Sequence, residues 1–292
     1  MRRVVLATVL GVIASAVAMA PSAAATQPRA EPVFITGCGT SLPKPGGGVW
    51  ECTFADEFSG SSLDRTKWLP QTNFATGTSS ASSRSCHVDD PANVAVRQGT
   101  LQLTVRKVKT PVVCKGSPAN YTSGQVSTYR MFSQQYGRFE ARMKVHRTFG
   151  SKPGLQETFW LWPDDRVASD VQWPAAGEID IAELYSQYNT LVVPFLHYTY
   201  NDNGGPIPGV NTAWNCPAAR GVYNTYTLTW TPSTLTILVN GETCLVNTSG
   251  DPAFQKPYIA VFTQALGVGA NALRWNTPIP ATMAVDHVRV WS

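Results

Sequence analysis

Apolar and polar residues alternate along many short runs of the chain, which is the period of a β-strand with one buried face. The two clearest alternating sets of apolar residues are Leu101, Leu103 and Val105, and Phe139, Ala141, Met143 and Val145. Further strand-like runs cover Val192–Tyr200, Tyr226–Trp230, Tyr258–Thr263 and Met283–Trp291. The pattern therefore predicts a chain built mainly from short strands.

One pair of strands is predicted together with its turn. Thr234–Val239 and Glu242–Val246 are strand-like and are separated by Asn240-Gly241. The Asn-Gly pair suits a type I′ turn, which joins two antiparallel strands closely. After the first twenty-five residues, no stretch combines helical periodicity with capping residues. Many short strands with frequent turns, without an internal repeat or a second domain, predict an all-β sandwich or barrel.

The first twenty-five residues have the features of an export signal. Arg2 and Arg3 make a basic start, and the apolar run Val4–Ala20 that follows carries no charge. Ala23-Ala24-Ala25 then offers small residues to a peptidase, so we expect cleavage before Thr26. A membrane anchor is the alternative, but the apolar run is short for a span. We therefore expect a secreted, extracellular protein without a membrane partner.

Three regions are expected along the chain. Residues 1–25 are the signal peptide, and residues 26–48, rich in Pro and Gly, predict an irregular N-terminal arm. Residues 49–292 fit one β-sandwich domain that carries the chemistry, because such domains often reach this size without splitting. We expect this domain to be a monomer.

Composition excludes one class of partner and suggests another. The formal charge of +4 falls to about +2 when Arg2 and Arg3 leave with the signal, and no basic cluster occurs, so a nucleic-acid partner is not expected. Charged residues make up only 14% of the chain, whereas it has 9 Trp, 10 Tyr and 11 Phe. Aromatic residues in such numbers fill a large core or stack on sugar rings, and we expect both.

The chain has six cysteines, all after the predicted signal. An even number in an exported protein favours three disulfide bonds. Metal binding is a weaker alternative, because no Cys-x-x-Cys spacing occurs and only four histidines are scattered along the chain. Six cysteines allow about fifteen pairings, from which we select neighbours in sequence. The predicted pairs are Cys38–Cys52, Cys86–Cys114 and Cys216–Cys244.

The segment with the clearest chemistry runs from Trp173 to Glu183 and ends in Glu-Ile-Asp-Ile-Ala-Glu. Glu178 and Asp180 lie two residues apart, so on a strand they share a face. Simple alternation would send Glu183 to the opposite, apolar face. One extra residue, a β-bulge near Ile181-Ala182, would return Glu183 to the face of the other two. The segment then presents three carboxylates in a row.

Crowded carboxylates raise one another's pKa values, which a surface strand does not need. Glycoside hydrolysis does need a carboxyl group with a raised pKa, because a retaining enzyme uses one ionised carboxylate as nucleophile and one protonated carboxyl as acid. A solvated acidic strand or a cation site is the alternative, and the three acids alone do not exclude it. Motifs for serine nucleophiles, zinc proteases, phosphate loops and dinucleotide binding do not occur.

The Glu-Ile-Asp-Ile-Ala-Glu run resembles the bulged, laminarinase-type signature of glycoside hydrolase family 16, which contains laminarinases, lichenases, agarases and carrageenases. The resemblance extends in order through nearly the whole mature chain. The other matching segments are Phe54–Gly60 with Leu63-Asp64 and Trp68, Tyr121–Gly124, Tyr136–Arg142, Phe159–Pro163 and Val285–Trp291. Six matches in the family's order make chance a poor explanation.

The resemblance implies a β-jelly-roll sandwich of two curved antiparallel sheets, concanavalin-like, with a substrate cleft on the concave face. It implies Glu178 as the nucleophile, Asp180 as its assistant and Glu183 as the general acid/base. Trp173 and Trp160 would floor or wall the cleft, although either tryptophan can instead pack in the core. His197 is also expected near the cleft, and a hydrogen-bonded interior position is the alternative for this residue.

Some family members hold a structural calcium on the convex side. The matching positions are Glu57 and Gly99, expected to contribute backbone carbonyls, and Asp286. Oxygen ligands from distant strands suit this hard cation, but Asp286 is equally compatible with a solvated strand. Catalysis itself needs no cofactor in this family.

The sequence departs from many laminarinases at two sugar-binding positions. Gln125 stands where many have Arg, and Thr263 stands where they usually have Asn, next to Gln264. We expect Gln125, Thr263 and Gln264 to contact substrate. The leading expectation is a retaining endo-β-1,3-glucanase, with β-1,3-1,4-glucan as a further substrate. The alternatives are the same chemistry on a galactan-type polymer, a transglycosylase, or a lectin-like carbohydrate-binding protein.

Overall fold

The computed structural model describes residues 37–167, 171–198 and 205–292. The predicted signal peptide and residues 26–36 of the predicted arm lie outside the described residues. Strands make up nearly all the regular structure of the described part, and its three 3₁₀ helices have three residues each. They are η1 Ala81–Ser83, η2 Pro252–Phe254 and η3 Gly269–Asn271. Among the described residues no helix is both long and apolar enough to span a membrane.

The larger sheet has eleven strands in the order β16-β15-β14-β9-β18-β6-β7-β4-β3, with β1 paired to β18 and β5 paired to β6. Its pairs are antiparallel except for β4 with β7, which is a parallel pair that the sequence did not predict. The strands are β1 Cys52–Asp56, β3 Ala75–Gly77, β4 Arg84–His87, β5 Val94–Arg97, β6 Thr100–Cys114, β7 Ser117–Ser123, β9 Gly137–Lys144, β14 Asn224–Trp230, β15 Leu235–Val239, β16 Glu242–Asn247 and β18 Ala281–Trp291.

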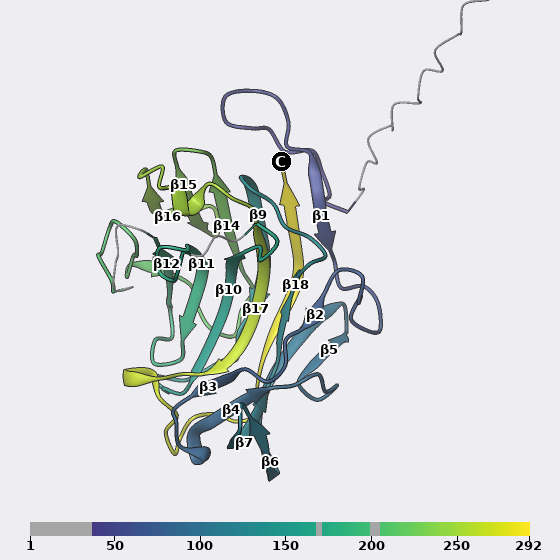
Figure 1. Ribbon diagram of the computed structural model, residues 1–292, viewed down its shortest axis with the longest axis vertical. Coiled ribbons are helices and arrows are strands. Elements are labelled where there is room, and N and C mark those ends of the chain that lie inside the picture. Colours follow the sequence, from purple (N-terminus) through teal and green to yellow (C-terminus); the bar gives the residue numbers. More distant parts are fainter. Residues whose placement is uncertain (1–36, 168–170, 199–204) are drawn as a thin grey trace, which may run out of the picture. The chain divides into compact units, whose positions relative to one another are not determined.

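The smaller sheet has seven antiparallel strands in the order β13-β12-β11-β10-β17-β8-β2. Its central strands β11, β10 and β17 curve side by side in Figure 1. The strands are β2 Leu69–Pro70, β8 Gln125–Ser127, β10 Leu155–Pro163, β11 Glu178–Tyr185, β12 Leu191–His197, β13 Cys216–Pro217 and β17 Tyr258–Leu266.

The two sheets bury their apolar faces against each other. Phe139 and Met143 from the larger sheet are fully buried in one cluster with Phe159 and Ile179 from the smaller sheet. Full burial of each such side chain contributes roughly 1.5–3 kcal/mol. The alternation that predicted β9 is present in the structure, because every second residue of this strand is buried. The predicted all-β sandwich is therefore confirmed.

Local predictions are confirmed as well. The predicted hairpin forms from β15 and β16, and Asn240 and Gly241 both have positive φ angles, 51° and 87°, as a type I′ turn requires. All three predicted disulfide bonds form. Cys38–Cys52 ties the described end of the arm to β1, where Cys38 packs against Ala55 and Trp291.

Candidate active site

Strand β11 lies in the middle of the smaller sheet, between β10 and β12. Its pairing with β12 shifts between Asp180 and Glu183, because two residues of β11, Ile181 and Ala182, lie opposite the single residue Pro194 of β12. The pairing with β10 shifts at the same place. This is the predicted β-bulge, with Ile181 and Ala182 fully buried. The bulge brings Glu183 to the face of the sheet that carries Glu178 and Asp180, since one cavity is lined by all three.

Glu178 begins the strand directly after Gly177, which has a φ of 93°. A side chain at this position would meet the Tyr258 hydroxyl 2.0 Å away, so the turn into the strand requires glycine. Trp173 Nε1 donates a hydrogen bond to Glu178 Oε2 at 2.7 Å. Burial and the neighbouring Asp180 carboxyl raise the pKa of Glu178 to about 8.

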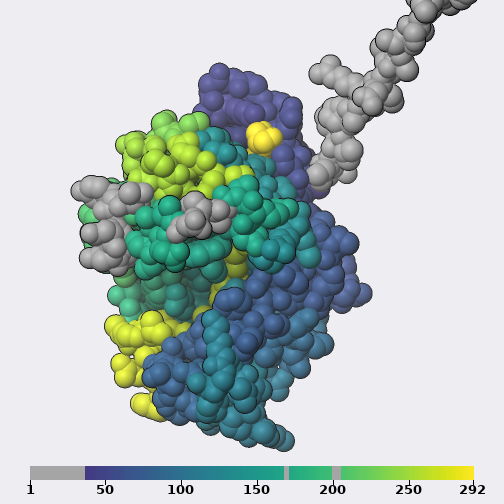
Figure 2. All heavy atoms as spheres, viewed as in Figure 1, coloured from purple at the N-terminus to yellow at the C-terminus, as the bar shows by residue number. Residues whose placement is uncertain are grey.

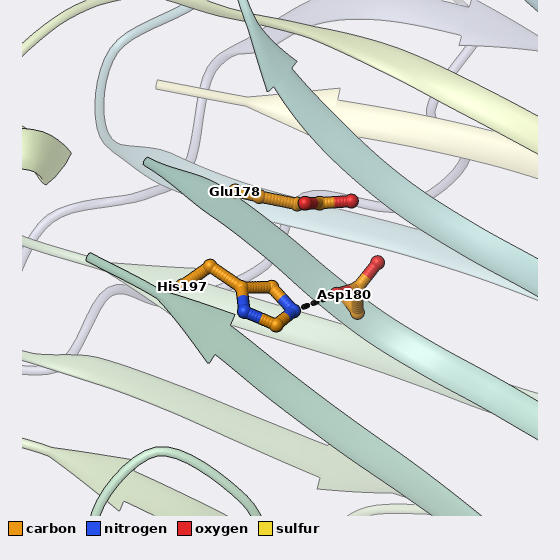
Figure 3. A group of neighbouring side chains, drawn as sticks. All are labelled: Glu178, Asp180 and His197. Atoms are coloured by element: carbon orange, nitrogen blue, oxygen red, sulfur yellow. Dashed lines mark ion pairs between the residues drawn. The ribbon is translucent and has the colours of Figure 1, made fainter. Parts of the chain in front are cut away.

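Asp180 lies between the two glutamates and is only 4% exposed. His197 faces Glu178 across the strand pair, and its Nε2 lies 3.5 Å from Asp180 Oδ2, as Figure 3 shows. The imidazole is stacked on Phe195 at 4.4 Å and tilts against Trp173 at 5.0 Å. Burial lowers the pKa of His197, which favours the neutral ring. Burial, followed by the Glu183 charge, raises the pKa of Asp180 well above its ordinary value.

Both carboxylate oxygens of Glu183 accept a hydrogen bond. Gln156 Nε2 donates to Oε1 at 2.8 Å from strand β10, and the Tyr185 hydroxyl donates to Oε2 at 2.7 Å. Burial raises the pKa of Glu183, while these two donors and His197 act in the opposite direction. Tyr185 lies two residues after Glu183, so alternation alone would place it on the same face. Neither Tyr185 nor Gln156 was predicted from the sequence.

The three carboxyl groups differ in the donors that stabilise their charge. Glu183 accepts two side-chain hydrogen bonds and Glu178 accepts one. For Asp180, no hydrogen-bond donor is found among the described residues, and burial is the main cause that raises the pKa of its carboxyl. We infer that the three carboxyl groups do not all carry a charge at the same time. Such a cluster holds ionised and protonated carboxyls side by side near neutral pH.

A cleft extends from these carboxylates across β10 and β17 to β8. It consists of two cavities of about 320 and 430 Å³. The residues that line both cavities are Ala75, Thr76, Gln125 and Trp160. Figure 2 shows this face hollowed between the blue N-terminal strands and the teal and green middle of the chain. An open cleft of this extent can accommodate several units of a polymer.

Three predicted substrate contacts form a hydrogen-bonded chain on the cleft floor. Trp160 Nε1 donates to Thr263 Oγ1 at 2.9 Å, and Thr263 Oγ1 donates to Gln125 Oε1 at 3.1 Å. This arrangement leaves the Gln125 amide group as a donor toward the cleft. Trp173 is 45% exposed, which excludes the core-packing alternative for this residue. Trp160 also lies in the cleft, because it lines both cavities.

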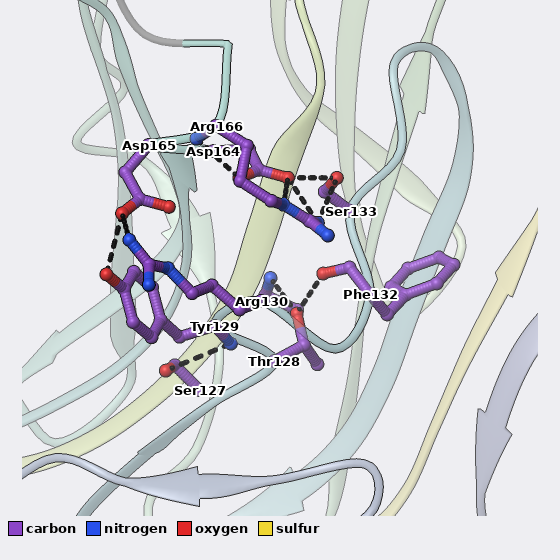
Figure 4. A network of polar contacts seen from close by, with 10 residues as sticks. Ser127, Thr128, Tyr129, Arg130, Phe132, Ser133, Asp164, Asp165 and Arg166 are labelled. Atoms are coloured by element: carbon purple, nitrogen blue, oxygen red, sulfur yellow. Dashed lines mark hydrogen bonds and ion pairs between the residues drawn. The ribbon is translucent and has the colours of Figure 1, made fainter.

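The far end of the cleft is walled by Tyr129, whose position is fixed by neighbouring loops (Figure 4). The Tyr129 hydroxyl donates to Asp165 Oδ2 at 2.6 Å, and Arg130 pairs with the same oxygen at 2.9 Å. The preceding residue, Asp164, binds Arg166, which lowers the pKa of the Asp164 carboxyl to about 2. The loop after β8 is thereby tied to the loop after β10.

The prediction that Gln264 contacts substrate is wrong. Tyr258, Ala260 and Phe262 of β17 point into the core, so the even-numbered residues of this strand face the other sheet. Gln264 belongs to that set and is 0% exposed. Thr263 occupies the cleft face instead. Gln264 lies opposite Glu157, a fully buried carboxylate that is paired with Arg220.

Two of the residues expected at the calcium position have side chains that are already paired with arginine. The Glu57 carboxylate accepts two bonds from Arg289, at 2.7 and 2.9 Å. Asp286 Oδ2 accepts from Arg142 Nη1 at 2.9 Å and lies 3.1 Å from His287 Nδ1. The only acidic side chain expected as a ligand is therefore neutralised by a guanidinium group.

Residues 81–282 match the sequence profile of glycosyl hydrolases family 16. The chain belongs to this family. The match includes the bulged strand β11, the cleft residue Gln125 and strand β17. The resemblance inferred from the sequence is thus confirmed.

The relatives of this family 16 protein carry names that refer to different polymers. Keratan-sulfate endo-1,4-beta-galactosidase of Sphingobacterium multivorum is 28% identical over 253 residues, which cover 83% of this chain and 55% of that protein. Glucan endo-1,3-beta-glucosidase A1 of Niallia circulans is 28% identical over 273 residues, which cover 83% of this chain and 37% of that protein. The chain thus spans about half of the first relative and less of the second.

Solved structures support the fold. The endo-beta-1,3-glucanase of Pyrococcus furiosus matches 86% of this chain and 97% of its own, with a TM-score of 0.71 and 22% identity. The laminarinase catalytic domain of Thermotoga petrophila RKU-1 matches 83% of this chain and 98% of its own, with a TM-score of 0.69 and 21% identity. The predicted jelly-roll sandwich is therefore confirmed.

Proposed function

We propose that the protein is a retaining endo-β-glycosidase that cleaves polysaccharide by double displacement. The observation that carries this proposal is a set of three carboxyl groups, which the bulge of β11 aligns on the floor of an open cleft. Asp180 and Glu183 are buried, and Glu178 is partly buried. Glu178 is the nucleophile, Glu183 is the general acid/base, and Asp180 is the assistant of Glu178. Three disulfide bonds support our further proposal that the protein acts outside the cell.

In the first step, Glu178 attacks the anomeric carbon while Glu183 gives its proton to the glycosidic oxygen. The bond between that carbon and oxygen breaks, and a glycosyl ester of Glu178 forms. The hydrogen bond from Trp173 Nε1 occupies Glu178 Oε2, which leaves Oε1 for attack.

In the second step, ionised Glu183 takes a proton from water, and the resulting hydroxide oxygen bonds to the anomeric carbon. The ester bond breaks and the Glu178 carboxylate returns. Tyr185 and Gln156 donate to the two oxygens of Glu183, which stabilises its charge at this stage. Neutral His197, stacked on Phe195 and tilted against Trp173, holds the floor of the site in place.

We propose β-1,3-glucan as the substrate, because a relative that covers 83% of this chain is named as a glucan endo-1,3-beta-glucosidase. Polymers of galactose are the second candidate. This alternative is favoured by the keratan-sulfate endo-β-galactosidase among the relatives and by the departures at Gln125 and Thr263. These two side chains lie on the cleft floor, where they contact sugar hydroxyls and not the bond that breaks.

Release of reducing ends from laminarin, lichenan, agarose, galactan and keratan sulfate tests the proposal. We expect the highest rate on laminarin, with oligosaccharides of several lengths as early products, since an open cleft binds the chain internally. A higher rate on a galactose polymer would establish the second candidate. Failure to cleave any of the five polymers would contradict the proposed glycosidase activity on them.

Replacement of Tyr185 by Phe should move the alkaline limb of the pH profile of kcat/KM to higher pH. The first step needs protonated Glu183, and loss of the Tyr185 donor destabilises its charged form, so the pKa of Glu183 rises. The other ionisable groups that face Glu183, namely Glu178, Asp180 and His197, are retained. Tyr188→Phe is the matched control and should leave the limb in place. An unchanged or lowered limb in Tyr185→Phe would contradict this role of the hydroxyl.

A further inference from the structure

A cluster of three aromatic side chains lies beside the acid/base, outside the cavities described above. The Tyr185 and Trp214 rings are nearly parallel, with their centroids 6.4 Å apart and an angle of 14°. Tyr188 meets Trp214 edge-on at 6.1 Å. Trp214 is nevertheless 41% exposed, although burial of a tryptophan is normally favourable. Its position is therefore defined by two tyrosines while much of its surface stays open to solvent.

The segment that carries Trp214 is held firmly along strand β12. Thr212 is bridged to Phe195, and its hydroxyl donates to the Pro194 carbonyl at 2.8 Å. Two residues after Trp214, Cys216 pairs with Val192 and forms a disulfide bond with Cys244. A side chain supported in this way is preorganised, so binding a ligand requires little additional ordering.

The position of Trp214 identifies its side of the scissile bond. The two cavities of the cleft extend from β11 toward β10, β17 and β8. Trp214 lies on the opposite side of β11, because its segment runs along β12 and leads into β13. It is connected to the acid/base through Tyr185, whose hydroxyl bonds Glu183 Oε2. Glu183 protonates the oxygen that joins the donor sugar to the leaving sugar. With the donor sugars in the two cavities, the leaving sugar lies on the side of β11 that carries these rings.

We propose that Trp214 and Tyr185 form the binding site for the sugar unit on the leaving-group side of the scissile bond. The inference rests on the proposed role of Glu183. The open surface of Trp214 contacts the apolar C–H face of a pyranose ring, a contact that aromatic side chains make in sugar sites. After the leaving sugar departs, the same surface holds an acceptor sugar. Transfer to that acceptor then competes with attack by water on the glycosyl ester.

The test compares two substrates that share a donor sugar and differ in the leaving group. One is an oligosaccharide of the polymer that the unaltered protein cleaves, which places sugars on the leaving-group side. The other is the corresponding disaccharyl fluoride, whose leaving group is fluoride and has no ring to bind. We expect Trp214→Ala to lower kcat/KM about 10-fold on the oligosaccharide and less than about 2-fold on the fluoride. Transfer to an added acceptor oligosaccharide should fall in parallel.

Two matched substitutions complete the test. Trp275 is 96% exposed in the loop after η3, so Trp275→Ala should leave both rates unchanged. Trp162 lines the cavity on the donor side, so Trp162→Ala should slow both substrates together. Equal losses on both substrates in Trp214→Ala, or no loss on either, would overturn the proposed site. If the unaltered protein cleaves neither substrate, the glycosidase proposal is wrong, and this inference, which depends on it, is wrong as well.

Discussion

Replacement of Glu178 by Gln should abolish hydrolysis, with a loss on the order of 10⁴–10⁶-fold in kcat, the range for removal of a nucleophile. The amide cannot form the glycosyl ester that the two-step reaction requires. The fold should survive, because Gln has the same shape and its carbonyl oxygen can still accept the hydrogen bond from Trp173 Nε1. Reducing-end release on the preferred polymer measures the loss. Glu242→Gln, in an exposed hairpin strand, is the matched control and should be fully active.

The same variant has a second readout in its stability. The pKa of Glu178 is raised to about 8 in the folded protein, so the folded state binds a proton that the unfolded state loses near pH 4.5. Stability from this group is therefore complete at low pH and is lost as pH rises through about 8. The melting temperature of the unaltered protein should fall over this window, and Glu178→Gln should show a smaller fall. Substantial turnover by a folded Glu178→Gln protein would remove Glu178 from the nucleophile role.

The sequence was sufficient to predict the geometry of β11 because two local rules conflict there. Alternation sends Glu183 to the apolar face, and burial of an unpaired carboxylate in the core is too unfavourable to be tolerated. A bulge resolves the conflict, and the register shift beside Ile181 shows that the chain adopts this solution. The hairpin at Asn240-Gly241 was predictable for a similar reason, since few residues accept two successive positive φ angles.

The incorrect assignment of Gln264 could have been avoided by the same rule. Thr263 and Gln264 are consecutive residues of one strand, so only one of them can face the cleft. Phe262 is a large apolar residue that belongs in the core. Alternation then places Gln264 on the core face and Thr263 on the cleft face. The surroundings of the expected calcium positions were not predictable for another reason. Arg142 of β9 pairs with Asp286 of β18, and Arg289 of β18 pairs with Glu57, which follows β1. These partners are far apart in sequence, so a motif of three residues does not include them.

Contacts between strands far apart in sequence limited the remaining predictions. Gln156 reaches Glu183 because β10 and β11 pair with Gln156 opposite Tyr185, and this register is fixed by the packing of the whole sheet. Trp214 reaches Tyr185 because its segment is bridged to β12 and tied by the disulfide bond of Cys216. No local pattern marks either residue. Long-range register therefore determines the surroundings of the carboxylates, whereas local alternation determines their alignment.

Replacement of Glu183 by Ala should nearly abolish cleavage of natural polymer, because the departing alkoxide then receives no proton. An aryl glycoside whose leaving group departs unaided should still form the glycosyl ester, which should accumulate. Added azide should accelerate its turnover, since this anion attacks without a general base. The substitution also leaves Gln156 Nε2 and the Tyr185 hydroxyl without their acceptor, beside space that azide can occupy.

The product should be a glycosyl azide of retained β configuration, as NMR of the isolated product can determine. An α product would mean that the enzyme inverts and that Glu178 acts as a base. If azide has no effect while the aryl substrate reacts as slowly as the polymer, Glu183 has a structural role and the proposed mechanism is wrong.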